Sequence, residues 1–95
     1  MVTMESCLAR APEAVEQLFP GEAVVMLPQQ GAVKVLNDVG ARIWALVDGR
    51  RTLGAIRDLI CAEYAVEPAE AERDLLAFAQ ELLQRAMVAI KAPAP

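Results

Sequence analysis

The feature that most constrains the fold is a change of hydrophobic period at Asn37. Residues 31–36 alternate as in a strand, with Val33 and Val35 on one side of the pleat and their neighbours on the other. The residues that follow Asn37 have helical spacing instead. The chain is therefore predicted to place a small sheet before a group of helices, with residues 32–36 as the last strand of that sheet.

Two further strands are predicted before this one. Residues 15–19 are a candidate first strand that ends at Pro20-Gly21, a pair suited to the central positions of a type II turn. Residues 22–27 are nearly all apolar, which predicts a central strand with a neighbour on each side. The strand at 32–36 is then terminal, and its outer row of backbone N–H and C=O groups is unpaired and able to receive a strand from another chain.

Two helices are predicted directly after the sheet. The first is capped by Asn37 or Asp38 and ends at Asp48-Gly49, where the glycine suits a left-handed conformation. The second has Thr52 as its N-cap and ends near Tyr64.

The third predicted helix has the clearest start, with Pro68 at its first position and acidic residues around it, and it runs to about Arg85. Its apolar residues cover two adjacent stripes, so one stripe can pack on the other helices while the second remains free. Residues 87–90 are a candidate for a short closing strand or wing.

The composition predicts one domain of the α+β class. The chain has 95 residues, of which 56% are hydrophobic, enough for a modest core without metal or disulfide. We expect residues 13–90 to form the domain, residues 1–12 a flexible N-terminal lead-in, and residues 91–95 a frayed tail. No apolar run is long enough to span a bilayer and the N-terminus does not resemble a secretion signal, so a cytoplasmic protein without a membrane partner is expected.

The residue types present argue against catalysis and against a metal site. The chain contains no histidine, which removes the commonest general base and the usual partner of a nucleophilic serine or cysteine. Its two cysteines, Cys7 and Cys61, are far apart and have no CxxC spacing. We therefore expect no catalytic residues, no metal ligands and no cofactor.

Nucleic-acid binding is opposed by the charge of the chain. The net charge is −4, and the third helix has only Arg73 and Arg85 as basic residues against four acidic ones. A winged-helix DNA-binding regulator is thus an alternative that the helical half permits and the electrostatics disfavour. A structural domain that dimerises by strand swapping through the open edge is the other alternative, and a monomer and a homodimer both remain open.

An ordered set of short motifs resembles the family of the pyrroloquinoline quinone biosynthesis protein D (PqqD), over roughly residues 14–90. The motifs are Gly31-Ala-Val-Lys-Val-Leu-Asn37, Ala41-Arg-Ile-Trp44, Asp48-Gly49 followed by Thr52, Tyr64, and Asp74-Leu-Leu-Ala-Phe78 leading to Leu82. The resemblance implies a three-stranded antiparallel β-meander followed by a three-helix, winged-helix-like bundle. It also implies a non-catalytic peptide chaperone of natural-product biosynthesis, of the kind called a RiPP recognition element, since its targets are ribosomally made precursor peptides.

By this resemblance, the leader segment of a precursor peptide would add as a strand antiparallel to residues 32–36, and its apolar side chains would enter a groove beside the third helix. The bound precursor would be presented to a modifying enzyme, either a radical S-adenosylmethionine protein or a leader peptidase. The predicted peptide-binding residues are Ala32, Val33, Lys34, Val35, Leu36, Leu75, Leu76, Ala79 and Leu83.

Two positions depart from the family pattern. Ala86 stands where many members have a glycine shortly after the third helix, so the helix can extend or end differently here. Ala55 replaces a glutamate that often completes the capping box of the second helix. Lys34 has two readings, as a partner for an acidic leader residue or as a guard against edge-to-edge aggregation, whereas Trp44 and Phe78 are predicted core residues.

Overall fold

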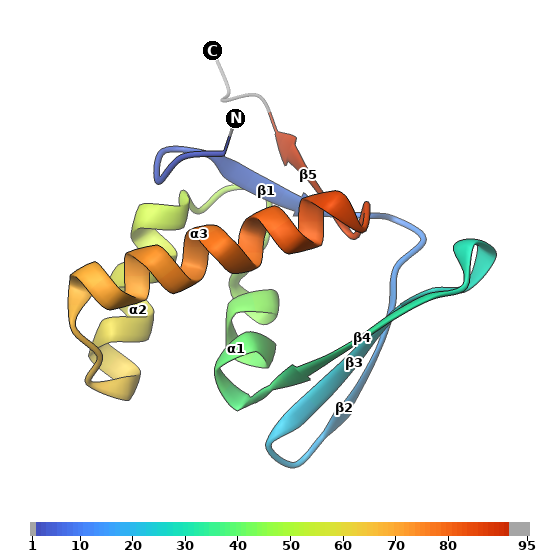
Figure 1. The fold of residues 1–95 in the computed structure, drawn as a ribbon, viewed down its shortest axis with the longest axis horizontal. Helices are drawn as coiled ribbons and strands as arrows, with labels where there is room; N and C mark the ends of the chain where they lie inside the picture. The colour runs from blue at the N-terminus through green and yellow to red at the C-terminus, as the bar shows by residue number, and fades with distance from the viewer. Residues whose placement is uncertain (1, 92–95) are drawn as a thin grey trace.

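A computed structural model describes residues 2–91 and contains two antiparallel sheets and three helices (Figure 1). One sheet has the strand order β2-β3-β4 and the other pairs β1 with β5. The elements are β1 (Cys7–Arg10), β2 (Val15–Phe19), β3 (Glu22–Leu27), the short 3-10 helix η1 (Pro28–Gln30), β4 (Ala32–Asn37), α1 (Asp38–Leu46), α2 (Leu53–Tyr64), α3 (Pro68–Gln84) and β5 (Val88–Lys91). The predicted α+β class, the three-stranded meander and the three helices are confirmed.

The meander has the order expected from its hydrophobic pattern. β3 is the central strand, and its residues Ala23, Val25 and Leu27 are buried on the side of the sheet that faces the helices. β2 joins β3 through Pro20-Gly21, where Gly21 has a φ of 76°, the left-handed value that the third residue of a type II turn requires. The opposite face of the sheet is solvent-exposed and includes Val33 on β4.

The helices begin where the sequence predicts, and side-chain caps account for two of the starts. Asn37 Oδ1 accepts a hydrogen bond from the Gly40 N–H at 2.8 Å, and Thr52 Oγ1 accepts one from the Ala55 N–H at 3.1 Å. α3 lies across α1 and α2, and the three-stranded sheet extends to one side of this bundle (Figure 1). No helix within residues 2–91 is both long and apolar enough to cross a bilayer.

Trp44 on α1 is part of the core, as predicted. Only 1% of its surface is exposed, and the guanidinium of Arg10 on β1 lies 5.7 Å from the centroid of its ring. Among residues 2–91 no group accepts a hydrogen bond from the indole N–H. The Trp44 ring thus lies in the core between α1 and β1.

The N-terminal segment differs from the prediction of a flexible lead-in. It contains β1, which pairs with β5 from Cys7↔Lys91 to Arg10↔Val88, and its Leu8 is buried at 2% exposure. The loop between α1 and α2 covers the other edge of β1, where the N–H of Gly49 donates to the carbonyl of Leu8 at 2.9 Å. The predicted closing strand at 87–90 is confirmed as β5, which includes Lys91, whereas residues 92–95 of the predicted tail lie outside the described residues.

α3 ends at Gln84, close to the predicted Arg85, and the chain then turns sharply toward β5. Ala86 occupies the left-handed region with a φ of 59° and donates its N–H to the carbonyl of Leu83 at 3.1 Å. Alanine is strained in this conformation, and glycine is not. The position that departs from the family pattern is therefore one where the backbone favours glycine.

Candidate functional site

β4 has an open edge that runs alongside the helical bundle. Its inner edge is paired with β3 from Ala32↔Leu27 to Asn37↔Glu22. Among residues 2–91, no strand and no backbone hydrogen bond from a loop or turn occupies its outer edge. The meander also leaves the outer edge of β2 open, but every residue of β2 is exposed, and within residues 2–91 its main packing neighbour is β3.

The register indicates which N–H groups of β4 face outward. The tight turn between β2 and β3 directs the N–H of Glu22 toward β2. Directions alternate along a strand, so Val25 exchanges hydrogen bonds with its register partner Lys34. The N–H groups of Val33 and Val35 consequently point to the open edge.

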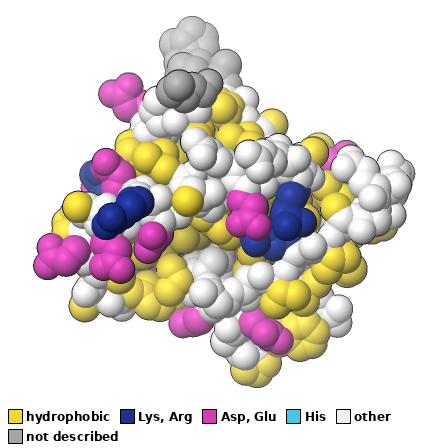
Figure 2. Space-filling model, in the orientation of Figure 1, with side chains coloured by type: hydrophobic (Ala, Val, Ile, Leu, Met, Phe, Trp, Pro, Cys, Tyr) yellow, Lys and Arg dark blue, Asp and Glu magenta, His cyan; other side chains and the backbone are white. Residues whose placement is uncertain are grey.

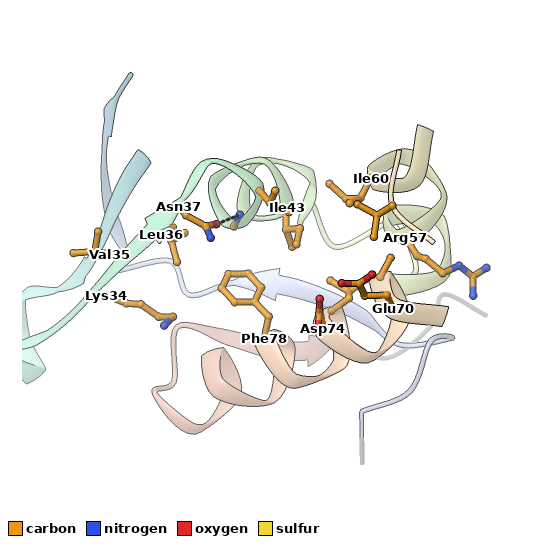
Figure 3. Close-up of a pocket in the computed structure, with 15 residues that line it drawn as sticks. Lys34, Val35, Leu36, Asn37, Ile43, Arg57, Ile60, Glu70, Asp74 and Phe78 are labelled. Carbon is orange, nitrogen blue, oxygen red and sulfur yellow. Dashed lines mark hydrogen bonds between the residues drawn. The ribbon is translucent and has the colours of Figure 1, made fainter. Parts of the chain in front are cut away.

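A hollow of about 420 Å³ lies beside the carboxyl end of β4, between α1, α2 and α3 (Figure 3). Its apolar lining includes Leu36, Ile43, Ile60, Leu75 and Phe78, most of which are buried core residues. Phe78 points from α3 toward the end of β4 and the start of α1 (Figure 3). An extended segment added to β4 would therefore continue over this hollow once it passes Asn37.

α3 contributes one side of the hollow. Of the four peptide-binding residues predicted on this helix, only Leu75 lines the hollow. Ala79 is 1% exposed in the core, whereas Leu76 and Leu83 are partly buried against it. Each helical residue advances about 100° around the axis, so residues 76 and 83 lie on the flank opposite to residues 74, 78 and 81. The residues of α3 that line the hollow are Glu70, Ala71, Asp74, Leu75 and Phe78, and the binding roles predicted for Leu76, Ala79 and Leu83 stay predictions.

Lys34 ties β4 to α3. Its Nζ lies 2.7 Å from Glu81 Oε1, and its side chain is only 17% exposed. The hydrogen bond from Lys34, with further attraction from Lys34 and Arg85, holds the pKa of the Glu81 carboxyl below its ordinary value, against the opposing effect of burial. The ammonium group of Lys34 is therefore engaged with Glu81, and both predicted roles of this lysine, in leader binding and as a guard of the edge, stay predictions.

The remaining charges of the hollow fall into two classes. Arg57 is engaged, because its Nη1 lies 2.8 Å from Glu72 Oε1 and its Nε lies 3.1 Å from Asp58 Oδ1. Glu70 and Asp74 point from α3 into the hollow (Figure 3), and neither forms an ion pair with another residue in the range 2–91. In the space-filling view, acidic side chains lie together with a basic one on the part of the surface where α3 begins (Figure 2).

Sequence reasoning assigned several of these lining residues to other roles. Glu70 is one of the acidic residues around the start of the third helix, and Phe78 is a predicted core residue. A signal was present, because Glu70, Asp74 and Phe78 are spaced four apart and so share one flank of a helix. Helical periodicity does not determine which of the two flanks, this one or the one with Leu76, faces β4.

Comparisons with known proteins agree with this architecture. The family model described as coenzyme PQQ synthesis protein D (PqqD) matches residues 22–88. A solved structure titled "TbiB1 in Complex with the TbiA(beta) Leader Peptide" is similar with a TM-score of 0.77 and 31% identity, covering 92% of this chain and 99% of that chain. A search of curated proteins gives no match. The family model spans most of the chain, and the similar solved structure is 31% identical over 92% of it, so this chain belongs to the PqqD family.

Proposed function

We propose that this protein is a RiPP recognition element that binds the leader segment of a ribosomally synthesised precursor peptide by strand addition to β4. The observation that carries the proposal is the open edge of β4 beside an apolar hollow. Family membership and the leader peptide bound to TbiB1 support the same class of ligand. The leader supplies main-chain partners for the N–H groups of Val33 and Val35, and its apolar side chains enter the hollow.

The proposal includes presentation of the bound precursor to a separate modifying enzyme. A domain of this kind contributes recognition, and the chemistry is then performed by a partner such as a radical S-adenosylmethionine protein or a leader peptidase. The chain itself has no histidine, the usual partner of a nucleophilic serine or cysteine, which supports a binding role.

The test replaces the outward N–H groups of β4 one at a time. Val35→Pro removes a donor on the open edge, and because the Val35 side chain is 61% exposed, the fold loses little packing. Binding of a candidate leader peptide that wild-type protein binds should weaken about tenfold or more, since one main-chain hydrogen bond contributes about 1 kcal/mol and strand geometry is also disturbed. Isothermal titration calorimetry measures the change.

Three variants serve as controls. Val35→Thr keeps the N–H and the β-branched shape, so it should bind nearly as wild type. Lys34→Pro removes a donor to β3 and should destabilise the fold itself. Lys34→Ala keeps the backbone and should have a much smaller effect on binding than Val35→Pro. Folded Val33→Pro and Val35→Pro proteins that bind the leader as wild type does would rule out strand addition at this edge.

A further inference from the structure

The unpaired acidic groups in the hollow suggest which leaders this protein selects, an inference that rests on the proposed leader binding. Glu70 and Asp74 share the lining with an apolar floor that includes Ile43 and Ile60. Both residues are solvent-exposed in the free protein, and a peptide that covers this floor would remove part of the water around their carboxylates. Covering a charge without a partner is costly, whereas a cation placed beside it offsets that cost.

The two basic residues that line the hollow do not neutralise the carboxylates of Glu70 and Asp74. Lys34 is held by Glu81 at 2.7 Å, and Arg57 is shared between Glu72 and Asp58. Each is thus matched by at least one carboxylate from outside the lining. The charge left for a ligand to neutralise is that of Glu70 and Asp74.

The two carboxylates are not equivalent. Glu70 lies in the first turn of α3, where the positive end of the helix dipole already favours its negative charge. Asp74 lies one turn further along the helix and receives less of this stabilisation, since the effect falls off within the first turn. Asp74 should therefore gain more than Glu70 from a ligand cation.

The direction of the bound strand determines where the cation belongs in the leader. The hollow lies beside the carboxyl end of β4, from Lys34 to Asn37. A strand antiparallel to β4 passes this end with its own N-terminal part. We propose that the hollow selects leaders with a lysine or arginine immediately N-terminal to the alternating apolar residues that pair with β4, and that Asp74, assisted by Glu70, binds this cation.

The experiment uses a displayed library of random peptides of about 16 residues, long enough at ~3.3 Å per residue to span β4 and the hollow. Wild-type protein should enrich peptides with a basic residue N-terminal to an apolar alternating segment. One enriched peptide is then made with lysine, glutamine or glutamate at that position, and binding is measured by fluorescence anisotropy at 0.15 M salt. Replacing lysine with glutamine should weaken binding about fivefold, as expected for an ion pair at a partly exposed site, and glutamate should weaken it further.

Two double variants test whether Glu70 and Asp74 cause the difference in affinity between the lysine and glutamine peptides. In the double variant Glu70→Gln, Asp74→Asn, the difference between the lysine and glutamine peptides should fall below about twofold. The double variant Glu5→Gln, Glu13→Gln removes the same charge from residues that do not line the hollow, and it should keep the full difference. Equal losses in the two double variants would overturn the inference.

The outcomes separate this inference from the proposed function. One outcome would refute the cation site and leave strand addition intact. In that outcome, the enriched peptides bind wild type but not Val35→Pro, and at this position they have an acidic residue or no preference for a basic one. If no peptide is enriched, or if every enriched peptide binds Val35→Pro equally well, the proposed function fails and the inference fails with it.

Discussion

β1 and β4 differ in how many of their edges have backbone hydrogen-bond partners. β1 has backbone partners on both sides, β5 on one and the α1–α2 connection on the other, where Cys7 bridges to Thr52 and the Leu53 N–H donates to the Ser6 carbonyl at 2.9 Å. β4 is paired with β3 alone among residues 2–91. The same chain thus closes one exposed edge with its own loop and leaves another open beside a hollow.

The difference indicates which edge stabilises the fold and which edge is available to pair with a strand from another chain. Leu8 on β1 is buried in the core, so the hydrogen bonds and the packing of this strand stabilise the fold. The open edge of β4 places its Val33 and Val35 side chains on the exposed face of the sheet, so its pairing capacity is not required by the fold. β2 is an informative third case, because its edge is open but none of its residues lines the hollow beside β4.

The largest expected effect tests the structural edge. Leu8→Ala should lower the free energy of unfolding by about 2–5 kcal/mol, the usual cost of truncating a buried leucine. Val33→Ala on β4 should cost less than about 1 kcal/mol, since the Val33 side chain is 52% exposed. Denaturant titration of the two proteins measures both values, and equal losses would remove the distinction between the edges.

A smaller effect concerns the turn that brings β5 to β1. Ala86→Gly should raise the free energy of unfolding by about 0.5–1 kcal/mol, because relief of left-handed strain exceeds the added entropy of glycine. Ala77→Gly, at an exposed position within α3, should lower it by about 1 kcal/mol. The opposite signs distinguish a conformational effect from a general effect of glycine, and a destabilised Ala86→Gly protein would show that residue 86 is not left-handed.

The smallest expected effect concerns the ion pair between Lys34 on β4 and Glu81 on α3. The pKa of Glu81 is held below its ordinary value of 4.5, mainly by the hydrogen bond from Lys34. Folding therefore gains from this group above about pH 4.5, and the gain is lost as the pH falls through the lowered pKa. In Lys34→Ala, NMR titration should give a higher pKa for Glu81, and stability should depend less on pH in the acid range. An unchanged Glu81 pKa would contradict the bridge.

Much of this fold could be predicted because local signals agreed with one another. Alternation at residues 32–36, the turn residues Pro20-Gly21 and the caps Asn37 and Thr52 each act over a few residues. β1 was missed because only Leu8 on it is deeply buried and its partner β5 lies at the far end of the chain. A pairing of such sequence separation leaves no local periodic signal.

The site was predictable in part. The open edge follows from the order of the strands, whereas the wall depends on how α3 is rotated about its axis. Its apolar surface is wide enough that Leu76 and Leu83 were plausible wall residues, although they lie on the flank away from Asp74 and Phe78. Rotation of a helix with a wide apolar surface is decided by packing against its neighbours, which the periodicity of one helix does not contain.

The most direct test of the account is amide hydrogen exchange, followed by NMR, with and without the leader peptide. Outward N–H groups on an open edge exchange with water until a strand pairs with them. The amides of Val33 and Val35 should become strongly protected on binding, whereas those of Glu16 and Leu18, which the same alternation places on the open edge of β2, should not change. Protection of Glu16 and Leu18 with no change at Val33 and Val35 would contradict the assignment of β4 as the binding edge.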